Sequence, residues 1–378
     1  MQIVFYILFF TFFFLMGILQ FFGLSITIAS YAISCVVCSA IFFSFLVQRK
    51  VIVNGYFLMN LTLLIWIIIS GIANQTDFFL VINYTSFVII PMALYLLVRN
   101  IIDKDIKPLY IIVNSLVIIQ LPILLLQYLF PSYIQYSHKL MIPIDRLFGT
   151  FPLAGDHALS FFLIMNIIFL FVSNNKFSVF NYIIILFSVI SILLMNSTIS
   201  YLLLLFVLLY FLSKKLNNLI FIPFIVSFLF LLLFFVSSFD IMTLLGKGSV
   251  AGIVGNASLF ESGTAGRFQS LYYLFSKELL IFGNGPGSYF NPFSGGFQVN
   301  ENFSQFIWFY FDLGIIGVII LFLLIFTYLK LFEISNYIKL ILAILLLSYS
   351  LFSNILDSIV FCMTLNIFAF LIQKHQKT

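Results

Sequence analysis

The sequence predicts an all-α protein that crosses a membrane many times. Of its 378 residues, 63% are apolar and only 8% are charged. A water-soluble domain carries about 25% charged residues, so this composition excludes a soluble enzyme with a single membrane anchor. Because about 20 apolar residues cross the hydrocarbon core of a bilayer, the chain is long enough for many spans and their loops. The net charge of +5 is not gathered into a basic patch, and no nucleic-acid partner is expected.

Apolar runs separated by polar interruptions predict about twelve membrane spans. The run that opens the chain has no basic segment before it and is longer than a signal peptide requires, so we expect it to remain as the first span. An even number of spans places both termini on the same side. The predicted spans cover residues 3–21, 23–47, 55–73, 78–98, 109–130, 153–173, 177–196, 198–213, 218–239, 309–330, 338–355 and 357–373.

The distribution of basic residues predicts which side each loop occupies. Lysine and arginine accumulate in cytoplasmic loops. With the N-terminus inside, twelve of the seventeen basic residues fall on the inner side, and nine of the twelve acidic residues fall at or near the outer side. The sequence therefore predicts that both termini are cytoplasmic.

Two predicted outer segments are too long to be simple turns. Within a single polytopic domain of residues 1–378, they cover residues 131–152 and 240–308. Eleven of the nineteen glycines lie between Gly246 and Gly296, where irregular backbone is expected. We expect these outer loops to carry the function, since loops on a rigid scaffold commonly hold the active residues.

The second outer loop contains one amphipathic stretch and one glycine-rich turn. Residues 268–282 place apolar side chains at steps of three and four, which predicts a helix lying flat at the membrane interface. Gly283, Gly285 and Gly287 then form a turn around Pro286. No strand precedes this turn, so a nucleotide-binding fold is not supported. The approach of a ligand's pyrophosphate to the turn backbone stays an open alternative.

The cysteines and the acidic residues give no sign of a metal or a disulfide. Cys35, Cys38 and Cys362 all lie in apolar runs, where thiols pack as small hydrophobic groups. No cluster of His, Asp and Glu with ligand spacing lies on the predicted outer side. We therefore expect neither a metal nor a cofactor.

Two regions of the chain resemble the bacterial O-antigen polymerases and ligases. The first is GTAGRFQSLYYLFSKELLIFGNGPGSYF, from Gly263, followed by NENFSQFIWFYFDLGIIGVIILFLL, from Asn300. The second is RLFGTFPLAGDHALSFFL, from Arg146, which is similar to the Arg-x-x-Gly-x-Phe start of a span in this family. The resemblance covers about 140–330 in motifs and the whole chain in layout.

The sequence also departs from the family in three places. The arginine-x10-glycine pattern of some polymerases fails, with His157 and Glu278 where glycine would fall. Ligases usually carry a His-Asn pair before the Gly-Ile-Ile-Gly span, where this chain has Glu301 and Asn302. Family members often show a Ser-Arg pair at the outer end of a middle span, where this chain has Ser197 and Ser200 without an arginine. The missing histidine weakens the ligase interpretation more than the polymerase interpretation.

The resemblance implies a function at the outer face of a bacterial inner (plasma) membrane. Members of the family transfer a glycan from a polyprenyl pyrophosphate carrier to an acceptor hydroxyl. We expect a polymerase of O-antigen or a related surface polysaccharide that moves the growing glycan from undecaprenyl pyrophosphate to a lipid-linked repeat unit, with inversion and a periplasmic active site. A flippase and a chain-length regulator of the same pathway are the implied protein partners. The alternatives are a ligase to the lipid A core and, in another class, a flippase or transporter of lipid-linked oligosaccharide.

The expected chemistry requires positively charged side chains that stabilise the departing pyrophosphate. Its developing charge needs fixed donors, and a planar guanidinium suits phosphate better than an ammonium. Arg146 and Arg267 are the only arginines predicted on the outer side, and Lys277 lies in the same loop as Arg267. We expect these three residues to contact the pyrophosphate. A structural ion pair or an interfacial anchor is the alternative role for each arginine.

The acceptor hydroxyl needs a base. Asp156 and His157 follow Arg146 by ten and eleven residues at the outer end of a span, and Glu301 lies where the ligases have their histidine. We expect the base among these three residues, although Asp156 and His157 suit a solvated helix start equally well. Asp312 is a weaker candidate for the base, and we expect it to be a packing or capping partner near the outer boundary. The amides inside predicted spans, Asn114, Gln120 and Gln127, are expected to join helices by hydrogen bonds. The remaining candidates for the base are His138, Asp145 and Glu261.

Overall fold

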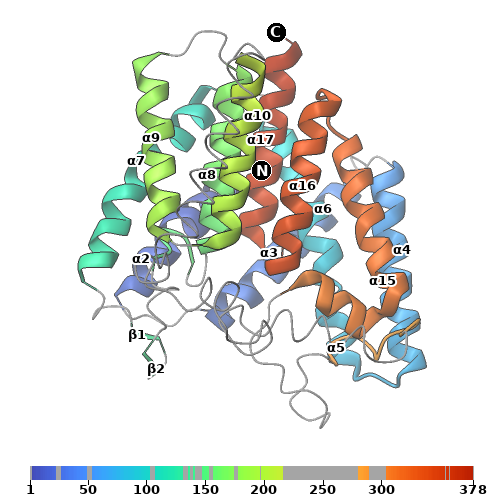
Figure 1. Ribbon diagram of the computed structural model, residues 1–378. Helices are drawn as coiled ribbons and strands as arrows, with labels where there is room; N and C mark the ends of the chain where they lie inside the picture. The colour runs from blue at the N-terminus through green and yellow to red at the C-terminus, as the bar shows by residue number, and fades with distance from the viewer. Residues whose placement is uncertain are drawn as a thin grey trace, which may run out of the picture.

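The computed structural model of the chain is a bundle of helices with a two-stranded hairpin at one end (Figure 1). The C-terminus lies at the opposite end of the bundle from that hairpin. The structure describes residues 2–22, 27–48, 53–102, 107–130, 135–136, 139–140, 147–152, 156–173, 178–195, 197–215, 280–288, 304–353, 355–356 and 358–377.

The elements of the described residues are helices, apart from the two short strands of the hairpin. In chain order they are α1 (Gln2–Phe10), η1 (Thr11–Leu15, a π-helix), α2 (Met16–Phe21), α3 (Thr27–Val47), α4 (Gly55–Ala73), α5 (Phe78–Tyr84), α6 (Ser86–Ile102), α7 (Lys107–Leu129), β1 (Gln135–Tyr136), β2 (Lys139–Leu140), α8 (Asp156–Ser173), α9 (Val179–Met195), α10 (Thr198–Lys215), α15 (Gln305–Lys330), α16 (Asn336–Phe352) and α17 (Ile359–Lys377). The two strands pair antiparallel, with Gln135 opposite Leu140.

The predicted class of helical membrane protein is supported by the length and apolarity of the helices. Six helical stretches have the length and composition of membrane spans, and they cover Gln2–Phe21, Gly55–Ala73, Phe78–Ile102, Pro108–Leu129, Gln305–Lys330 and Ile359–Gln376. Helices also occupy the other predicted ranges that the structure describes, while 218–239 lies outside the described residues. The count of twelve spans and the cytoplasmic termini stay predictions.

The two long outer segments predicted from the sequence are described only in part. The hairpin and residues 147–152 belong to the first segment, and residues 280–288 and 304–308 belong to the second. Most of the predicted interfacial helix over 268–282 lies outside the described residues. Its last three residues, 280–282, are not helical, and the carbonyl of Leu280 accepts from Ile315 N–H of α15 at 2.9 Å.

Polar residues between the apolar runs fix where several helices begin. Asn54 accepts a hydrogen bond from the backbone N–H of Phe57 at 2.9 Å and so caps α4. Asp77 caps α5 in the same way through Phe79 N–H, at 2.8 Å. Such caps satisfy N–H groups that a helix leaves unpaired at its start.

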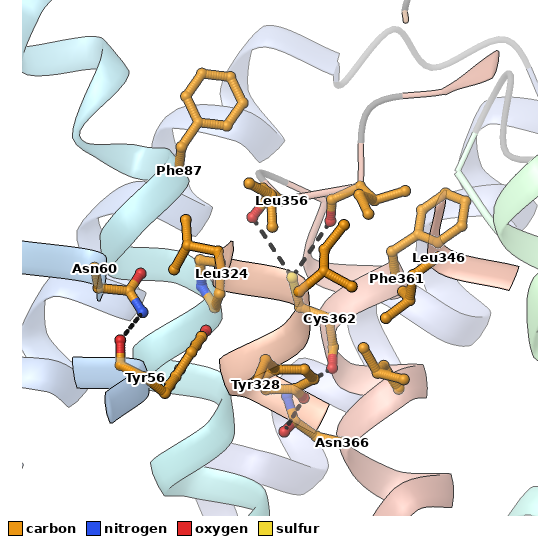
Figure 2. Close-up of a pocket in the computed structure, with 14 residues that line it drawn as sticks. Tyr56, Asn60, Phe87, Leu324, Tyr328, Leu346, Leu356, Phe361, Cys362 and Asn366 are labelled. Atoms are coloured by element: carbon orange, nitrogen blue, oxygen red, sulfur yellow. Dashed lines mark hydrogen bonds between the residues drawn. The ribbon is translucent and has the colours of Figure 1, made fainter. Parts of the chain in front are cut away.

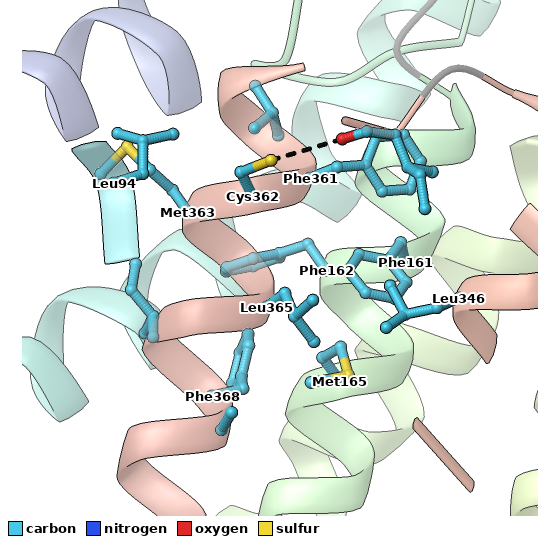
Figure 3. Packing of buried hydrophobic residues seen from close by; sticks show 14 of the residues in the cluster. Leu94, Phe161, Phe162, Met165, Leu346, Phe361, Cys362, Met363, Leu365 and Phe368 are labelled. Atoms are coloured by element: carbon cyan, nitrogen blue, oxygen red, sulfur yellow. Dashed lines mark hydrogen bonds between the residues drawn. The ribbon is translucent and has the colours of Figure 1, made fainter. Parts of the chain in front are cut away.

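Helix α17 lies in the centre of the bundle between α6 and α8. Figure 3 shows its side chains interleaved with those of α8, where the rings of Phe162 and Phe368 lie 5.4 Å apart and those of Phe161 and Phe361 lie 5.1 Å apart. In a lipid environment, close packing of this kind replaces the hydrophobic effect as the force between helices. Large apolar side chains are also exposed on the outside of the bundle, such as Val47 at 83% and Phe79 at 79%, as expected for a surface that faces lipid.

Helices α4 and α15 run antiparallel along each other. Trp66 of α4 donates from Nε1 to the carbonyl of Leu313 at 2.9 Å, and Ser70 donates from Oγ to the carbonyl of Asp312 at 3.2 Å. Gly55, at the start of α4, faces Thr327 near the end of α15. The link between α4 and α5 therefore lies at one end of the bundle, and the link between α15 and α16 lies at the other.

Candidate active site

His157, one of the bases predicted from the sequence, lies at the start of α8 and is half-buried. Its Nδ1 lies 3.1 Å from Oγ of Ser197, the residue that precedes α10. Asp156 is the first residue of α8, and its side chain lies outside the described part of the structure. The link before α10 therefore supplies a partner that holds the histidine ring.

A chain of buried hydroxyls continues from this contact into the bundle. Ser200 Oγ lies 2.9 Å from Ser197 Oγ and 2.7 Å from Ser160 Oγ. The phenol oxygen of Tyr349 lies 2.9 Å from Ser160 Oγ and 3.2 Å from Ser200 Oγ. Ser160, Ser200 and Tyr349 are each 0% exposed. One hydrogen-bonded network thus joins α8, α10 and α16 beneath His157.

The order of the hydroxyl hydrogens in this network sets the tautomer of His157. Ser200 has one hydroxyl hydrogen, so it donates to Ser160 or to Ser197 but not to both at once. When it donates to Ser160, Ser197 Oγ can accept from Nδ1–H of the histidine, and Nε2 is then the basic nitrogen. The network can therefore leave Nε2 as the proton-accepting nitrogen of His157.

A non-helical segment, residues 147–152, leads the chain to α8 and is held by two amides of α7. Oε1 of Gln127 accepts from the N–H groups of Phe148 and Gly149, at 3.1 and 2.8 Å, and its Nε2 donates to the Gly149 carbonyl at 2.7 Å. Gln120 accepts from Thr150 N–H at 3.0 Å and donates to Thr150 Oγ1 at 2.7 Å. Both glutamines are fully buried. They therefore supply the hydrogen bonds that a buried irregular backbone needs.

The π-helical turn η1 provides the other half of this anchorage. Such a turn interrupts the regular hydrogen bonds of a helix. Here Gly17 N–H donates to the Thr150 carbonyl at 3.1 Å, and Thr150 Oγ1 donates to the Phe13 carbonyl. The backbones come so close that a Cβ on Gly17 would lie 2.3 Å from Phe151 O. Residues 147–152 are thus pinned between the first helical region and α7.

Asp312 holds a second irregular segment against a break in α15. Its carboxylate is 0% exposed. Oδ2 accepts from the hydroxyl of Tyr84 at 2.6 Å and from Gly287 N–H at 2.9 Å, while Oδ1 accepts from Ser288 Oγ at 2.8 Å. The break itself is at Gly314, whose φ of +70° is a left-handed conformation that favours glycine. Asp312 is therefore the packing partner that the sequence predicts, in the sense that it joins α5, α15 and the glycine-rich turn.

Backbone N–H groups of the glycine-rich turn are hydrogen-bonded to other residues of the protein. Asn284 N–H donates to the Phe311 carbonyl at 2.9 Å and Gly285 N–H donates to the Asp312 carbonyl at 3.0 Å. Gly283, Gly285 and Gly287 all have positive φ, and a Cβ on Gly283 would lie 2.3 Å from the Asp312 carbonyl oxygen. The alternative that this turn cradles a pyrophosphate is therefore wrong for the amides of residues 284, 285 and 287. Their N–H groups are occupied by α15.

The start of α15 is tied to the helix that carries Tyr349. Gln305 N–H donates to the Ser353 carbonyl at 3.3 Å, and Gln305 Oε1 accepts from the N–H groups of Ile355 and Leu356, at 3.3 and 3.4 Å. The link between α16 and α17 is thereby held beside α15. The hydroxyl network under His157 and the Asp312 contact consequently belong to the same end of the bundle.

Most of the residues predicted for the site lie outside the described residues. This applies to Arg146, Arg267, Lys277 and Glu301, and to the weaker candidates His138, Asp145 and Glu261. The structure brings His157 together with Ser197 and Ser200. From the sequence, these two serines mark only the position where family members carry a Ser-Arg pair. The hydroxyls of Ser160 and Tyr349 were missed, because nothing in their sequence surroundings marks them.

The amides inside the predicted spans have different roles from those expected. Gln120 and Gln127 bind the backbone of residues 147–152 rather than another helix. Both side-chain polar atoms of Asn114 are buried and have no hydrogen-bond partner among the described residues. Helix-to-helix bonding is therefore not what these three amides do within the described chain.

A small cavity lies in the interior of the bundle between α4, α6, α15, α16 and α17 (Figure 2). Its volume is about 40 Å³, enough for water molecules but not for a sugar. Tyr328 donates to Asn366 Oδ1 there, and Asn60 donates to the Tyr56 carbonyl at 2.9 Å. No Asp, Glu, Lys, Arg or His side chain of the described residues lines it.

No metal group stands out in the portion of the chain that the structure covers, since no three His, Cys, Asp or Glu residues there could hold an ion together. No protein-family model matches this chain, and comparisons with curated proteins and with solved structures likewise found no match. The function is therefore argued from the site itself.

Proposed function

We propose that the protein is a glycosyltransferase of a bacterial plasma membrane that polymerises O-antigen or a related surface polysaccharide. In this proposal the growing glycan moves from undecaprenyl pyrophosphate to a lipid-linked repeat unit at the outer face. Neither a metal nor a cofactor is assigned to the reaction. A flippase and a chain-length regulator of the same pathway are the proposed partners.

The observation that carries the proposal is the setting of His157. The side chain is half-buried, and its Nδ1 contacts Ser197 at 3.1 Å at the end of a buried hydroxyl network. An imidazole that is oriented through one nitrogen and belongs to a residue with part of its surface exposed meets two requirements of a general base. A histidine that only filled space in the core would be enclosed on all sides.

The proposed reaction is a single displacement. Nε2 of His157 takes the proton of the acceptor hydroxyl while the hydroxyl oxygen attacks the anomeric carbon of the growing glycan. The bond from that carbon to the pyrophosphate oxygen breaks, and the undecaprenyl pyrophosphate leaves with the electron pair. The attack comes from the side opposite the leaving group and therefore inverts the anomeric centre.

Arg146, Arg267 and Lys277 are proposed to stabilise the departing pyrophosphate. Arg146 directly precedes residues 147–152, whose backbone Gln127 and Gln120 hold. Lys277 precedes Leu280 by three residues, and the Leu280 carbonyl accepts from Ile315 N–H at 2.9 Å. Two of the three cations therefore flank segments that are anchored to the bundle. Anchorage of this kind supports a role that needs charges at fixed positions.

The test is a reconstitution of the full chain in liposomes with a synthetic undecaprenyl-pyrophosphate-linked repeat unit. We expect a ladder of lengthened products without an energy gradient. His157→Ala should lower the rate by about 100-fold or more, the usual contribution of a general base. His375→Ala is the matched control. It changes an exposed histidine in the last turn of α17, at the end of the bundle opposite to His157, and should leave the rate unchanged.

The products also separate the proposal from its alternatives. Transfer to the lipid A core without lengthening would identify a ligase, and translocation of lipid without covalent change would identify a flippase. The interior cavity gives no support to transport, because no charged side chain of the described residues lines it. A product ladder that His157→Ala leaves unchanged would remove His157 from the mechanism.

A further inference from the structure

A second cavity lies at the end of the bundle opposite to His157. It has a volume of about 430 Å³. Four helices end or begin around it, since Asn54 precedes α4, Arg99 lies in the last turn of α6, Leu331 follows α15 and Lys374 lies in the last turn of α17. The start of α15 is tied to the α16–α17 link near Tyr349, so the end of α15 is remote from the candidate active site.

Several hydrogen-bond donors converge on this cavity. Arg99 is half-buried and makes no hydrogen bond or ion pair with the other residues that the structure describes. Lys374 donates from Nζ to the carbonyl of Ile102 at 2.8 Å and also lines the cavity. Oε1 of Gln373 is buried and has no hydrogen-bond partner within the described chain. Because the two ends of an amide are interchangeable by rotation, Gln373 can turn its Nε2 toward the cavity.

The remaining lining fits a small anion with an apolar part. Asn54 uses Oδ1 to cap α4, which leaves its Nδ2 as a donor. The rings of Tyr95 and Phe370 stack with centroids 5.6 Å apart and form an apolar wall. Glu333 also lines the cavity, and its side chain is exposed to solvent. The charged lining thus consists of two cations and one exposed anion.

We propose that this cavity binds a phosphate group at the membrane boundary, as the headgroup of an anionic phospholipid or as free phosphate. The forked guanidinium of Arg99 would bind two phosphate oxygens and Gln373 would donate to a third, while the positive charge of Lys374 adds to the attraction. Basic pockets between the ends of membrane helices are suited to phospholipid headgroups. The site is separate from the proposed glycosyl transfer, and neither depends on the other.

The experiment measures binding by the purified full-length chain in a neutral detergent. Native mass spectrometry would compare retention of phosphatidylglycerol with retention of diacylglycerol, which lacks the phosphate. A thermal-shift titration with inorganic phosphate forms the second arm. We expect preferential retention of phosphatidylglycerol, a stabilising shift with inorganic phosphate, or both. Retention of the lipid alone would assign the site to a headgroup, and the shift alone would assign it to free phosphate.

Two variants with the same change in charge give the comparison. Arg99→Gln should weaken phosphate binding by about tenfold, as expected for the loss of a charge-assisted hydrogen bond. Lys339→Gln removes one charge from the start of α16, outside the cavity lining, and should bind like the unchanged chain. Should Arg99→Gln not fold, Arg99→Lys keeps the charge without the fork and should show a partial loss. Equal binding by all variants, or no preference for phosphate over diacylglycerol, would overturn the proposal.

Discussion

At the scale of single residues, Asp312 joins three segments that are far apart in the sequence. Its carboxylate accepts from Tyr84, Gly287 and Ser288 while fully buried. Asp312→Ala leaves all three donors unpaired, and we expect a loss of about 3 kcal/mol in the free energy of unfolding. Fluorescence-detected unfolding in detergent would measure this loss, since Trp66 donates to the neighbouring Leu313 carbonyl and reports on the region.

The comparison for Asp312 is Ser288→Ala, which removes only one of the donors. The expected loss is then about 1 kcal/mol, because the carboxylate keeps its other two partners. A loss from Asp312→Ala no larger than that from Ser288→Ala would show that the carboxylate does not hold the three segments together.

Ser197 allows the role of the hydroxyl network to be tested without removing the proposed base. Ser197→Ala deletes the partner of His157 Nδ1. We expect kcat to fall by about tenfold with little change in KM, since the residue orients the base rather than binding substrate. The measurement is the rate of product lengthening in liposomes.

Ser191→Ala is the matched control for Ser197. Ser191 is also a buried serine, but its Oγ has no hydrogen-bond partner among the described residues. Its replacement should leave kcat unchanged. If Ser197→Ala behaves like Ser191→Ala, the network does not position His157.

At the scale of elements, α7 acts as a support for the segment that leads into α8. Gln127→Leu removes three hydrogen bonds to Phe148 and Gly149. We expect amide hydrogen exchange of residues 147–152 to become about tenfold faster, because local opening no longer breaks those bonds. Hydrogen-exchange mass spectrometry of a peptide over this segment would measure the change.

Asn114→Leu is the control for Gln127→Leu. It also replaces a buried amide of α7 by leucine, but Asn114 makes no hydrogen bond with residues 147–152. Asn114 is buried in α7, and its amide atoms have no partner in the described part of the chain. Exchange of residues 147–152 should stay as it is, and the overall stability should not fall, because an unpaired amide is replaced by an apolar group. An equal acceleration in both variants would mean that Gln127 acts through general stability alone.

At the scale of the whole molecule, the sequence predicts the helices well and the irregular segments poorly. Apolar runs such as 55–73 and 309–330 mark their helices because span length and hydropathy are local properties. The contacts of Gln127 and Asp312 could not be predicted in this way. Their partners are backbone groups and hydroxyls of residues distant in the chain, and only the packing of the helices brings them together.

The residues of the candidate site differ in the same way in whether the sequence predicts them. His157 could be selected from the sequence because a titratable residue at the end of an apolar run is locally conspicuous. Tyr349 and Ser160 could not, because a hydroxyl inside an apolar helix has many structural uses. The break at Gly314 could not be predicted either, since a single glycine in an apolar run does not reveal its φ.

The orientation of the bundle is the property on which the proposed outer active site depends. Asn74, at the end of α4, and Ser335, before α16, are exposed and lie at opposite ends of the antiparallel pair α4 and α15. With both termini in the cytoplasm, Asn74→Cys faces outward and Ser335→Cys faces inward. In a background with the three native cysteines replaced, a membrane-impermeant maleimide added to intact cells should label Asn74→Cys alone. After permeabilisation it should label both. Labelling of Ser335→Cys alone in intact cells would place the end that carries His157 in the cytoplasm, where an exported lipid-linked repeat unit cannot reach it.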